Sequence, residues 1–352
     1  MEALYESIRR NAQGGRRMLN GLFILHDEAC RKIYTPEVRK EIEKHVHILG
    51  PQLDARTVRD HEALLEGVEV IFSGWGGPKL DASFLEAAPR LKAVFYGAGS
   101  VKSMVTEDFW DRNIPITSAY AANAVPVAEY VLSQILFLLR GGWLLAQRVK
   151  QDRNYGVMRE WGGELPGTCG STVGIVSLGM IGRRVRELLR PFDLHVLAYD
   201  PYVSQEQGEA LGVEMCGLEE LFRRSDVITL HTPWLKETEG LITGEHFASM
   251  KRRASFINTA RGAVVREQEM IEALRKRPDL QAVLDVTYPE PPEPDSPLFT
   301  LPNVMLTPHI AGSMTVNECQ RMGMYMVEEL RRFVDGQPLQ WEIRRERAAT
   351  MA

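Results

Sequence analysis

The sequence predicts an α/β protein with parallel sheets, divided between two domains. Short apolar runs alternate with helix-like segments from about residue 21 to residue 310, a pattern typical of parallel sheets covered by helices on both faces. The chain has 352 residues, which is too long for one small core and favours two domains. A glycine-rich turn follows the apolar run near residue 173 rather than the first one, so the first hundred-odd residues form their own domain.

The apolar runs give ten candidate strands. Helix-like segments with start signals separate most of them; Thr35-Pro36-Glu37, for example, supplies a cap, a proline at the first helical position and an early acid. The expected strands are 21–25, 45–49, 68–72, 91–95, 172–176, 195–199, 227–230, 254–258, 282–286 and 304–307.

Residues 173–201 are interpreted as a dinucleotide-binding unit, because they combine a strand, a glycine turn, a helix and a second strand ending in an acid. The segment GIVSLGMIG matches the usual pattern except at its first glycine position, which is Ser177. We expect serine to fit this position provided that its φ is negative, at a modest cost in strain. Gly179 would let the backbone approach a pyrophosphate, and Gly182 would let the helix pack on the strand. The expected cofactor contacts here are Ser177, Gly179, Met180, Ile181 and Gly182.

The acid that ends the second strand is Asp200. A carboxylate at this point binds ribose hydroxyls and repels a 2′-phosphate, so it favours NAD over NADP. The alternative interpretation is an ordinary tight turn with Asp200 as a surface acid.

The order of these segments predicts a discontinuous arrangement of domains. We assign residues 120–309 to the nucleotide-binding domain and residues 1–119 and 310–352 to a second domain. After residue 309 the chain contains a helical pattern over 315–333 and no further strand–helix units, so it is expected to return to the first domain. The cleft between two domains is the expected ligand site.

Three side chains in the last third of the chain form a candidate catalytic set. Arg261 follows an expected strand and can hold a carboxylate by two parallel hydrogen bonds. His309 follows the last expected strand and can give and take a proton near neutral pH. Glu290 lies in a proline-rich loop, where a carboxylate near the imidazole would favour its protonated form. Taken singly, each residue has an ordinary alternative: a surface arginine, a solvated acid and a capped structural histidine.

Composition excludes several functions. The net charge of −5 argues against a general nucleic-acid-binding protein. Four scattered cysteines without metal-type spacing predict reduced thiols in a cytoplasmic protein and no metal site. The first twenty residues have no apolar signal region and are interpreted as an arm or a short packing helix. The most apolar stretch, 130–139, is too short to cross a membrane and is interpreted as a buried or interface helix.

The chain resembles the D-isomer-specific 2-hydroxyacid dehydrogenases, a family that includes phosphoglycerate, glycerate/hydroxypyruvate, glyoxylate and D-lactate dehydrogenases. The resemblance extends over nearly the whole chain after about residue 20. It rests on LEAAPRLKAVFYGAG, ANAVPVAEY, GIVSLGMIG, LHTPWLKETEGLI, INTARGAVV, LDV with Glu290 five residues after Asp285, and LPNVMLTPHIAG. Two segments depart from the family pattern: Ser177, and Val101–Met104 in place of the usual V-D-x-I-D.

The resemblance implies a Rossmann-type, doubly wound parallel sheet inserted in a smaller flavodoxin-like substrate domain. It implies an NAD-dependent enzyme that interconverts a small 2-oxo acid and its D-2-hydroxy acid, with His309 as acid/base, Glu290 as its partner and Arg261 on the substrate. It further implies a homodimer built through the long helix after Asn123. The remaining residues implied to contact cofactor are Thr232, Pro233, Thr259, Ala260 and Asp285, and those implied to contact the substrate carboxylate are Gly99 and Ser100.

Two alternatives remain open at this stage. The protein could be a non-catalytic NAD-binding regulatory or partner-binding module, because a fold alone does not confer activity. It could also be a dehydrogenase of formate or of an amino acid. The pairing of His309 with Glu290 argues against formate, whose oxidation needs no proton relay of this type.

Overall fold

The computed structural model describes residues 17–157, 159 and 163–351. Most of the expected N-terminal arm lies outside these residues. The chain divides into two compact units, each described by itself below. Unit 1 contains the described residues up to Asn123 together with Ser313–Met351, and unit 2 contains the described residues between Ala124 and Gly312. Unit 2 is therefore inserted in the sequence of unit 1.

Unit 1 contains a six-stranded sheet in the order β13-β5-β4-β3-β1-β2. The order of its first five strands is 2-1-3-4-5, which is the flavodoxin-like order. All pairs are parallel except β13–β5, in which Ile343 lies opposite Ile116. The strands are β1 (Leu19–Ile24), β2 (Val46–Ile48), β3 (Val70–Ser73), β4 (Ala93–Tyr96), β5 (Ile116–Ser118) and β13 (Glu342–Ile343).

Helices cover both faces of this sheet. One face packs mainly on α2, α3 and α15, and the other on α4, α5, α6 and α16. Successive residues of β1 point to opposite faces of the sheet. Phe23 packs in the core with α2, α3 and α15, whereas Leu22 and Ile24 pack in the core on the other face. The helices are α2 (Asp27–Ile33), α3 (Pro36–Ile42), η1 (Val58–His61), α4 (Glu62–Leu65), α5 (Ala82–Ala87), α6 (Glu107–Asp111), α15 (Val316–Val334) and α16 (Arg345–Thr350).

Unit 2 contains a seven-stranded parallel sheet in the order β12-β11-β10-β9-β6-β7-β8. Counted from β6, this is the 3-2-1-4-5-6 Rossmann order extended by one strand. The strands are β6 (Ser171–Val176), β7 (Leu194–Tyr199), β8 (Glu214–Met215), β9 (Val227–Leu230), β10 (Ser255–Asn258), β11 (Gln281–Leu284) and β12 (Val304–Leu306).

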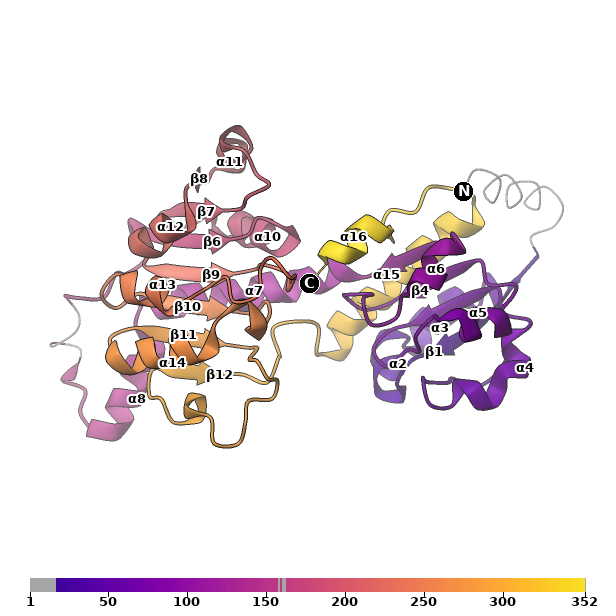
Figure 1. Ribbon diagram of the computed structural model, residues 1–352, viewed down its shortest axis with the longest axis horizontal. Helices are drawn as coiled ribbons and strands as arrows, with labels where there is room; N and C mark the ends of the chain where they lie inside the picture. The colour runs from indigo at the N-terminus through magenta and orange to yellow at the C-terminus, as the bar shows by residue number, and fades with distance from the viewer. Residues whose placement is uncertain (1–16, 158, 160–162, 352) are drawn as a thin grey trace. The chain divides into compact units, whose positions relative to one another are not determined.

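Two helical layers bury this second sheet. Helices α12, α13 and α14 cover one face, as Figure 1 shows, while α7 and α10 cover the opposite face. The helices are α7 (Tyr120–Leu139), α8 (Gly142–Asp152), α10 (Met180–Leu189), α11 (Gln205–Leu211), α12 (Leu218–Arg224), α13 (Gly244–Ser249), η2 (Gly262–Val264), α14 (Glu267–Lys276) and η3 (Pro297–Phe299).

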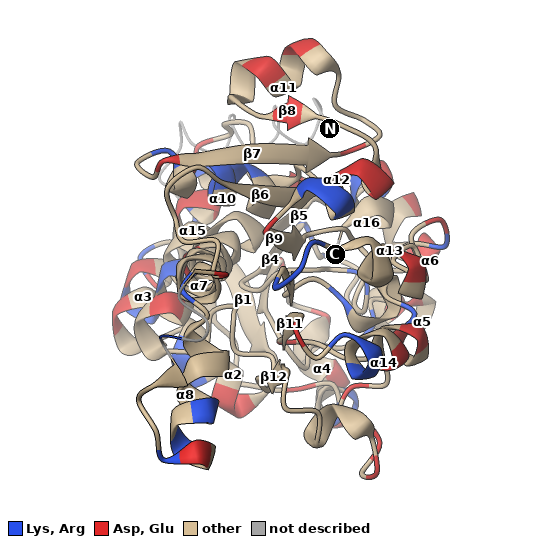
Figure 2. Ribbon diagram, turned by 90° about the vertical axis from the view of Figure 1, so that its left-hand side faces the viewer, with Lys and Arg blue, Asp and Glu red and all other residues tan. Residues whose placement is uncertain are grey.

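The strand sequences explain why both sheets are internal. In Figure 2 the strands β6 and β7 are tan, whereas the short edge strand β8, which contains Glu214, is partly red. Strands β9, β10 and β11 are buried along their whole length and contain no Lys, Arg, Asp or Glu. Continuous apolar strands of this kind are typical of parallel sheets covered on both faces.

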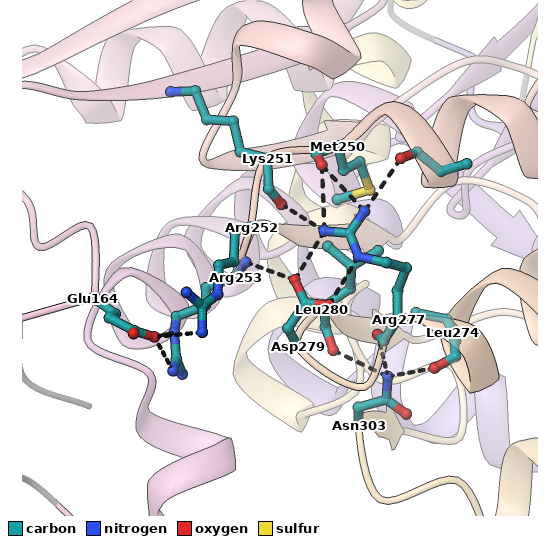
Figure 3. Close-up of polar contacts among 11 residues, drawn as sticks. Glu164, Met250, Lys251, Arg252, Arg253, Leu274, Arg277, Asp279, Leu280 and Asn303 are labelled. Carbon is teal, nitrogen blue, oxygen red and sulfur yellow. Dashed lines mark hydrogen bonds and ion pairs between the residues drawn. The ribbon is translucent and has the colours of Figure 1, made fainter. Parts of the chain in front are cut away.

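A polar network fixes the amino ends of strands in unit 2, as Figure 3 shows. Arg277 pairs with Asp279 at 2.8 Å, and Asp279 also accepts the backbone N–H of Arg253 at 3.1 Å. The side chain of Arg253 pairs with Glu164. Asn303, buried just before β12, donates to backbone carbonyls in the last turn of α14 and on the segment that leads to β11. These contacts hold the sheet edge opposite to the one where ligands bind in such folds.

Helix α7 corresponds to the long helix expected after Asn123, but its bounds differ from that expectation. The helix begins earlier, at Tyr120, and ends at Leu139. The left-handed conformation of Gly141, with a φ of +62°, interrupts the helix before α8 begins. With 20 residues, α7 is long and apolar enough to cross a membrane by length and composition alone. Half of its apolar window is buried inside the structure, and the core helix of a soluble protein passes the same test.

The predicted fold class is confirmed, and each of the ten predicted strands lies within two residues of its expected bounds. The sequence analysis missed β5, β8 and β13. These strands have only two or three residues, so they leave almost no apolar pattern to detect.

Candidate active site

The residues predicted to contact the cofactor and to carry the chemistry lie in unit 2, just after the carboxyl ends of its strands. Strands β6, β9, β10 and β11 pair in parallel register, so the segments that follow them meet at one edge of the sheet. This is the edge at which doubly wound sheets bind ligands.

The turn after β6 corrects one prediction. Ser177 has a φ of +79°, whereas we expected serine to fit only with a negative φ. The turn therefore keeps the left-handed conformation that glycine normally supplies, and serine adopts it at a cost in strain. The Ser177 N–H donates to the carbonyl of Tyr199 at 2.7 Å, which ties this conformation to the end of β7.

Asp200 lies directly beside this turn. Its carboxylate accepts the Leu178 N–H at 2.8 Å and the Tyr202 N–H at 2.9 Å, and it lies 3.4 Å from the Ser177 hydroxyl. The acid at the end of the second strand is thus oriented by three protein donors. It is partly exposed and keeps lone pairs that face solvent.

The two glycines of the turn have different surroundings. A Cβ placed on Gly182 would lie 2.1 Å from the carbonyl oxygen of Ser177, so this glycine is needed for α10 to pack on the turn. A Cβ on Gly179 would meet only the Ser177 hydroxyl oxygen, at 4.0 Å. Gly179 therefore leaves an open space beside the exposed N-terminus of α10, where Met180 begins the helix and the first N–H groups have no intrahelical acceptor.

Neighbouring segments after β9 and β10 present unsatisfied polar atoms. Thr259 and His231 are buried, and within the described part of the chain Thr259 Oγ1 and His231 Nδ1 have no hydrogen-bond partner. Buried polar atoms normally have partners, so these two atoms, just after the carboxyl ends of β9 and β10, fit a bound polar ligand. Thr232, Pro233 and Ala260 lie next to these two residues in sequence.

Asp285 organises the loop that contains His309. Its carboxylate accepts the Thr307 hydroxyl at 2.5 Å, the Ile310 N–H at 2.8 Å and the Ala311 N–H at 2.9 Å. The backbone N–H of His309 also donates to the carbonyl of Asp285 at 3.0 Å. Asp285, which we expected to contact the cofactor, therefore fixes the conformation of the loop that contains His309.

His309 and Glu290 form a close pair. His309 Nδ1 lies 2.6 Å from Glu290 Oε1, and because an ionised carboxylate only accepts, the imidazole donates this hydrogen bond. About half of each side chain is exposed. The hydrogen bond assigns a proton to Nδ1 of His309.

Arg261 completes the set. Burial lowers the pKa of the Arg261 guanidinium, and the negative charge of Glu290 opposes this effect. Glu290 thus interacts with both the cation and the imidazole. The Arg261 side chain donates to its neighbour's carbonyl, that of Ala260, at 2.6 Å, and Asn258 fixes the Arg261 backbone carbonyl at 3.1 Å.

Two predicted substrate residues belong to unit 1. Gly99 and Ser100 follow β4 at the carboxyl edge of the unit 1 sheet, and both are partly exposed. The Gly99 carbonyl accepts the Ser118 hydroxyl, which fixes the turn.

Sequence reasoning missed a contact from α7 to the histidine loop. The Tyr130 hydroxyl lies 3.0 Å from Thr307 Oγ1, which in turn donates to Asp285. Both residues stand inside motifs quoted for the family resemblance, but nothing in the sequence shows that two segments so far apart meet. Among the described residues there is no group of three or more metal-ligating side chains, and all four cysteines are free thiols.

A Rossmann-type sheet, a glycine turn, an acid at the end of the second strand and a histidine paired with a carboxylate are together typical of dinucleotide-dependent dehydrogenases. Residues 132–311 match the NAD-binding domain of the D-isomer specific 2-hydroxyacid dehydrogenases. The chain belongs to this family, and its unit 2 contains the family's NAD-binding domain.

Among its relatives is the D-3-phosphoglycerate dehydrogenase of Archaeoglobus fulgidus, which is 35% identical over 262 residues. The match covers 74% of this chain and 49% of the relative, so the chain spans about half the length of the curated relatives it matches.

Two solved structures illustrate the similarity in fold. The NAD-dependent formate dehydrogenase from Staphylococcus aureus, in complex with NAD, is 26% identical with a TM-score of 0.68. The match covers 92% of this chain and 97% of that one. The apo D-mandelate dehydrogenase of Rhodotorula graminis has a TM-score of 0.78 at 23% identity, with 93% and 98% coverage, and shows the fold alone.

Proposed function

We propose that this protein is an NAD-dependent dehydrogenase that interconverts a small 2-oxo acid and the corresponding D-2-hydroxy acid. The observation that supports it most directly is the 2.6 Å pair between His309 and Glu290 beside Arg261, at the ligand edge of an NAD-binding sheet. A protein that only bound NAD would need none of these three side chains in this arrangement.

In this proposal the turn after β6 holds the dinucleotide. The exposed N–H groups of α10 bind the pyrophosphate, Gly179 gives it room, and Asp200 accepts from the ribose hydroxyls. Residues 232–233, 259–260 and Asp285 line the nicotinamide end. NADH, when bound, supplies the hydride.

The protein's own residues handle the carboxylate and the proton. Arg261 holds the substrate carboxylate and stabilises negative charge on the keto oxygen. Protonated His309 donates its Nε2 proton to that oxygen as the hydride arrives, while Glu290 stabilises the imidazolium through Nδ1. In the oxidative direction His309 accepts the proton from the substrate hydroxyl.

The substrate panel should include 3-phosphohydroxypyruvate, because several relatives are named D-3-phosphoglycerate dehydrogenases. Hydroxypyruvate, glyoxylate and pyruvate complete it. NADH oxidation with at least one of these acids supports the proposal over the non-catalytic alternative. Oxidation of formate with NAD, without activity on the 2-oxo acids, would instead favour the activity named for the Staphylococcus aureus protein.

Substitution of Arg261 tests the role of the cation. Arg261→Ala should weaken substrate capture, raising KM by about 10²-fold or more, because a charge-assisted pair is lost. Steady-state kinetics on the best acid of the panel measure this, with the exposed Arg275→Ala on α14 as the matched control. If KM and turnover of Arg261→Ala were both those of the wild type, Arg261 would have no part in substrate binding.

We also propose that the protein is a cytoplasmic homodimer that assembles through α7, without nucleic-acid or membrane partners. The buried side of this helix covers the unit 2 sheet, but Phe137 is 43% exposed and packs edge-on against Trp143. Free thiols at all four cysteines are consistent with a reducing compartment.

A further inference from the structure

The Glu290 carboxylate needs a fixed loop. Glu290 is about 40% exposed, and a long side chain on a surface loop would lose rotamer entropy in meeting His309. The structure restrains the loop two and three residues before Glu290, at Tyr288 and Thr287. The Thr287 hydroxyl donates to the carbonyl of Pro289 at 2.8 Å, which fixes the local turn.

The first external restraint is Gly262. A Cβ at this position would lie 2.0 Å from the carbonyl carbon of Thr287 and 2.5 Å from the nitrogen of Tyr288. The backbone of the Glu290 loop therefore rests directly on the backbone that follows Arg261. This contact links the position of the cation to that of the carboxylate.

The second external restraint is Glu267, the first residue of α14. Its Oε2 accepts the backbone N–H of Tyr288 at 3.1 Å. Burial raises the pKa of this carboxyl, and the hydrogen bond from Tyr288 opposes the effect. Partial burial of a carboxyl is unfavourable compared with full solvation. The hydrogen bond to the Tyr288 N–H offsets part of that penalty and fixes the backbone of the Glu290 loop.

We propose that Glu267 is a positioning residue, which holds the Thr287–Tyr288 backbone so that the Glu290 carboxylate meets the His309 imidazole. The proposal rests on the proposed function for its effect on turnover, but its effect on the imidazole can be observed without any reaction. Trp234, whose ring lies 5.2 Å from that of Tyr288, supports the same loop from the segment after β9.

The chain offers a matched control in the same helical turn. Glu269 accepts the Gly244 N–H at 2.8 Å and pairs with Arg266, and these contacts lie away from the Glu290 loop. Glu267→Ala removes the acceptor, Glu267→Asp keeps the charge but shortens the reach by one methylene, and Glu267→Gln keeps an acceptor oxygen of the same length. Glu269→Ala removes a comparable carboxylate from the same turn.

The first readout is the tautomer of His309 in the protein without cofactor or substrate. The two ring-nitrogen resonances, observed through the ring C–H protons and assigned with His309→Ala, report which nitrogen has the proton. Wild type, Glu267→Gln and Glu269→Ala should show the Nδ1–H form that a carboxylate partner selects. Glu267→Ala and Glu267→Asp should shift toward Nε2–H, and Glu290→Ala, which removes the acceptor altogether, should do the same.

The second readout is steady-state kinetics. Glu267→Ala and Glu267→Asp should lower kcat about 10- to 100-fold with KM nearly unchanged, because a misplaced partner affects the proton transfer and not the capture of substrate. Their thermal unfolding midpoints should stay near that of the wild type, because the freed Tyr288 N–H lies at the surface and can bind water.

The outcomes separate the two proposals. A wild-type tautomer and wild-type kcat in both Glu267→Ala and Glu267→Asp would overturn the role of Glu267 and leave the proposed function intact. A tautomer shift in these variants, in a protein that oxidises NADH with none of the acids, would support the role of Glu267 and count against the proposed function. Should Glu267→Ala not fold, the Asp variant alone decides.

Discussion

At the scale of single residues, Ser177 is where the chain departs most clearly from its family pattern. A serine with a φ of +79° occupies the position that glycine fills in the dinucleotide turn. Strain of this kind persists only where surrounding contacts enforce it. Here two hydrogen bonds enforce it, from the Ser177 N–H to the Tyr199 carbonyl and from the Leu178 N–H to the Asp200 carboxylate. The sequence could not reveal this conformation because the neighbouring strand imposes the geometry of the turn.

Ser177→Gly should therefore stabilise the protein. Relief of left-handed strain is worth about 1–2 kcal/mol, and the extra freedom of glycine in the unfolded chain offsets part of it, so the expected net gain is about 0.5–1 kcal/mol. Urea unfolding measures the change. Ser177→Ala keeps the strain and serves as control; an equal gain in both variants would show that the backbone conformation is not the cause.

His231 gives a pH dependence at the same scale. Burial lowers the pKa of His231 to about 3, so the folded protein keeps it neutral where the unfolded chain would protonate it. The free energy of unfolding is not reduced by His231 above the unfolded pKa of about 6.5, and it declines as the pH falls from there toward 3. At pH 4.5 the loss amounts to about 2–3 kcal/mol.

The measurement compares urea unfolding at pH 7 and pH 4.5 for wild type and His231→Gln. Other groups titrate over this interval in both proteins, so the informative quantity is the difference between their pH dependences. Parallel curves for the two proteins would mean that His231 is not held neutral by burial.

At the scale of elements, the turn between β6 and α10 separates packing from binding. Gly182→Ala places a methyl group against the backbone carbonyl of Ser177 and should cost about 1–3 kcal/mol of stability. Gly179→Ala meets nothing closer than 4.0 Å and should leave stability within about 0.5 kcal/mol, while it weakens NADH binding about tenfold or more.

Urea unfolding and a fluorescence titration with NADH test this pair of glycines together. Unchanged NADH affinity in a well-folded Gly179→Ala protein would place the pyrophosphate elsewhere.

Elements also show how far sequence reasoning reaches. Strands such as Val227–Leu230 were predictable because an unbroken apolar run has a direct local cause. Strand β13 was not, because Ile343 gains its partner from a strand more than two hundred residues earlier. The same holds for the link between Glu267 and Tyr288, because only the folded sheet brings the start of α14 next to the Glu290 loop.

At the scale of the whole molecule, family membership and the proposed reaction rest on different observations. The match over residues 132–311 identifies the NAD-binding domain, whereas the substrate and the reaction follow from proposals about Arg261, Glu290 and His309. The sequence located these three residues through motif order and family resemblance. Their proximity in unit 2 follows from the parallel strands that end beside one another.

The most direct test of the account is NADH oxidation with the four 2-oxo acids by wild type, His309→Ala and the exposed control His47→Asn. We predict that at least one acid supports turnover by wild type and control. His309→Ala should lose about 10²–10⁴-fold in kcat while it still binds NADH, because a positioned general acid contributes that much. Turnover by His309→Ala close to the wild-type rate would contradict the account.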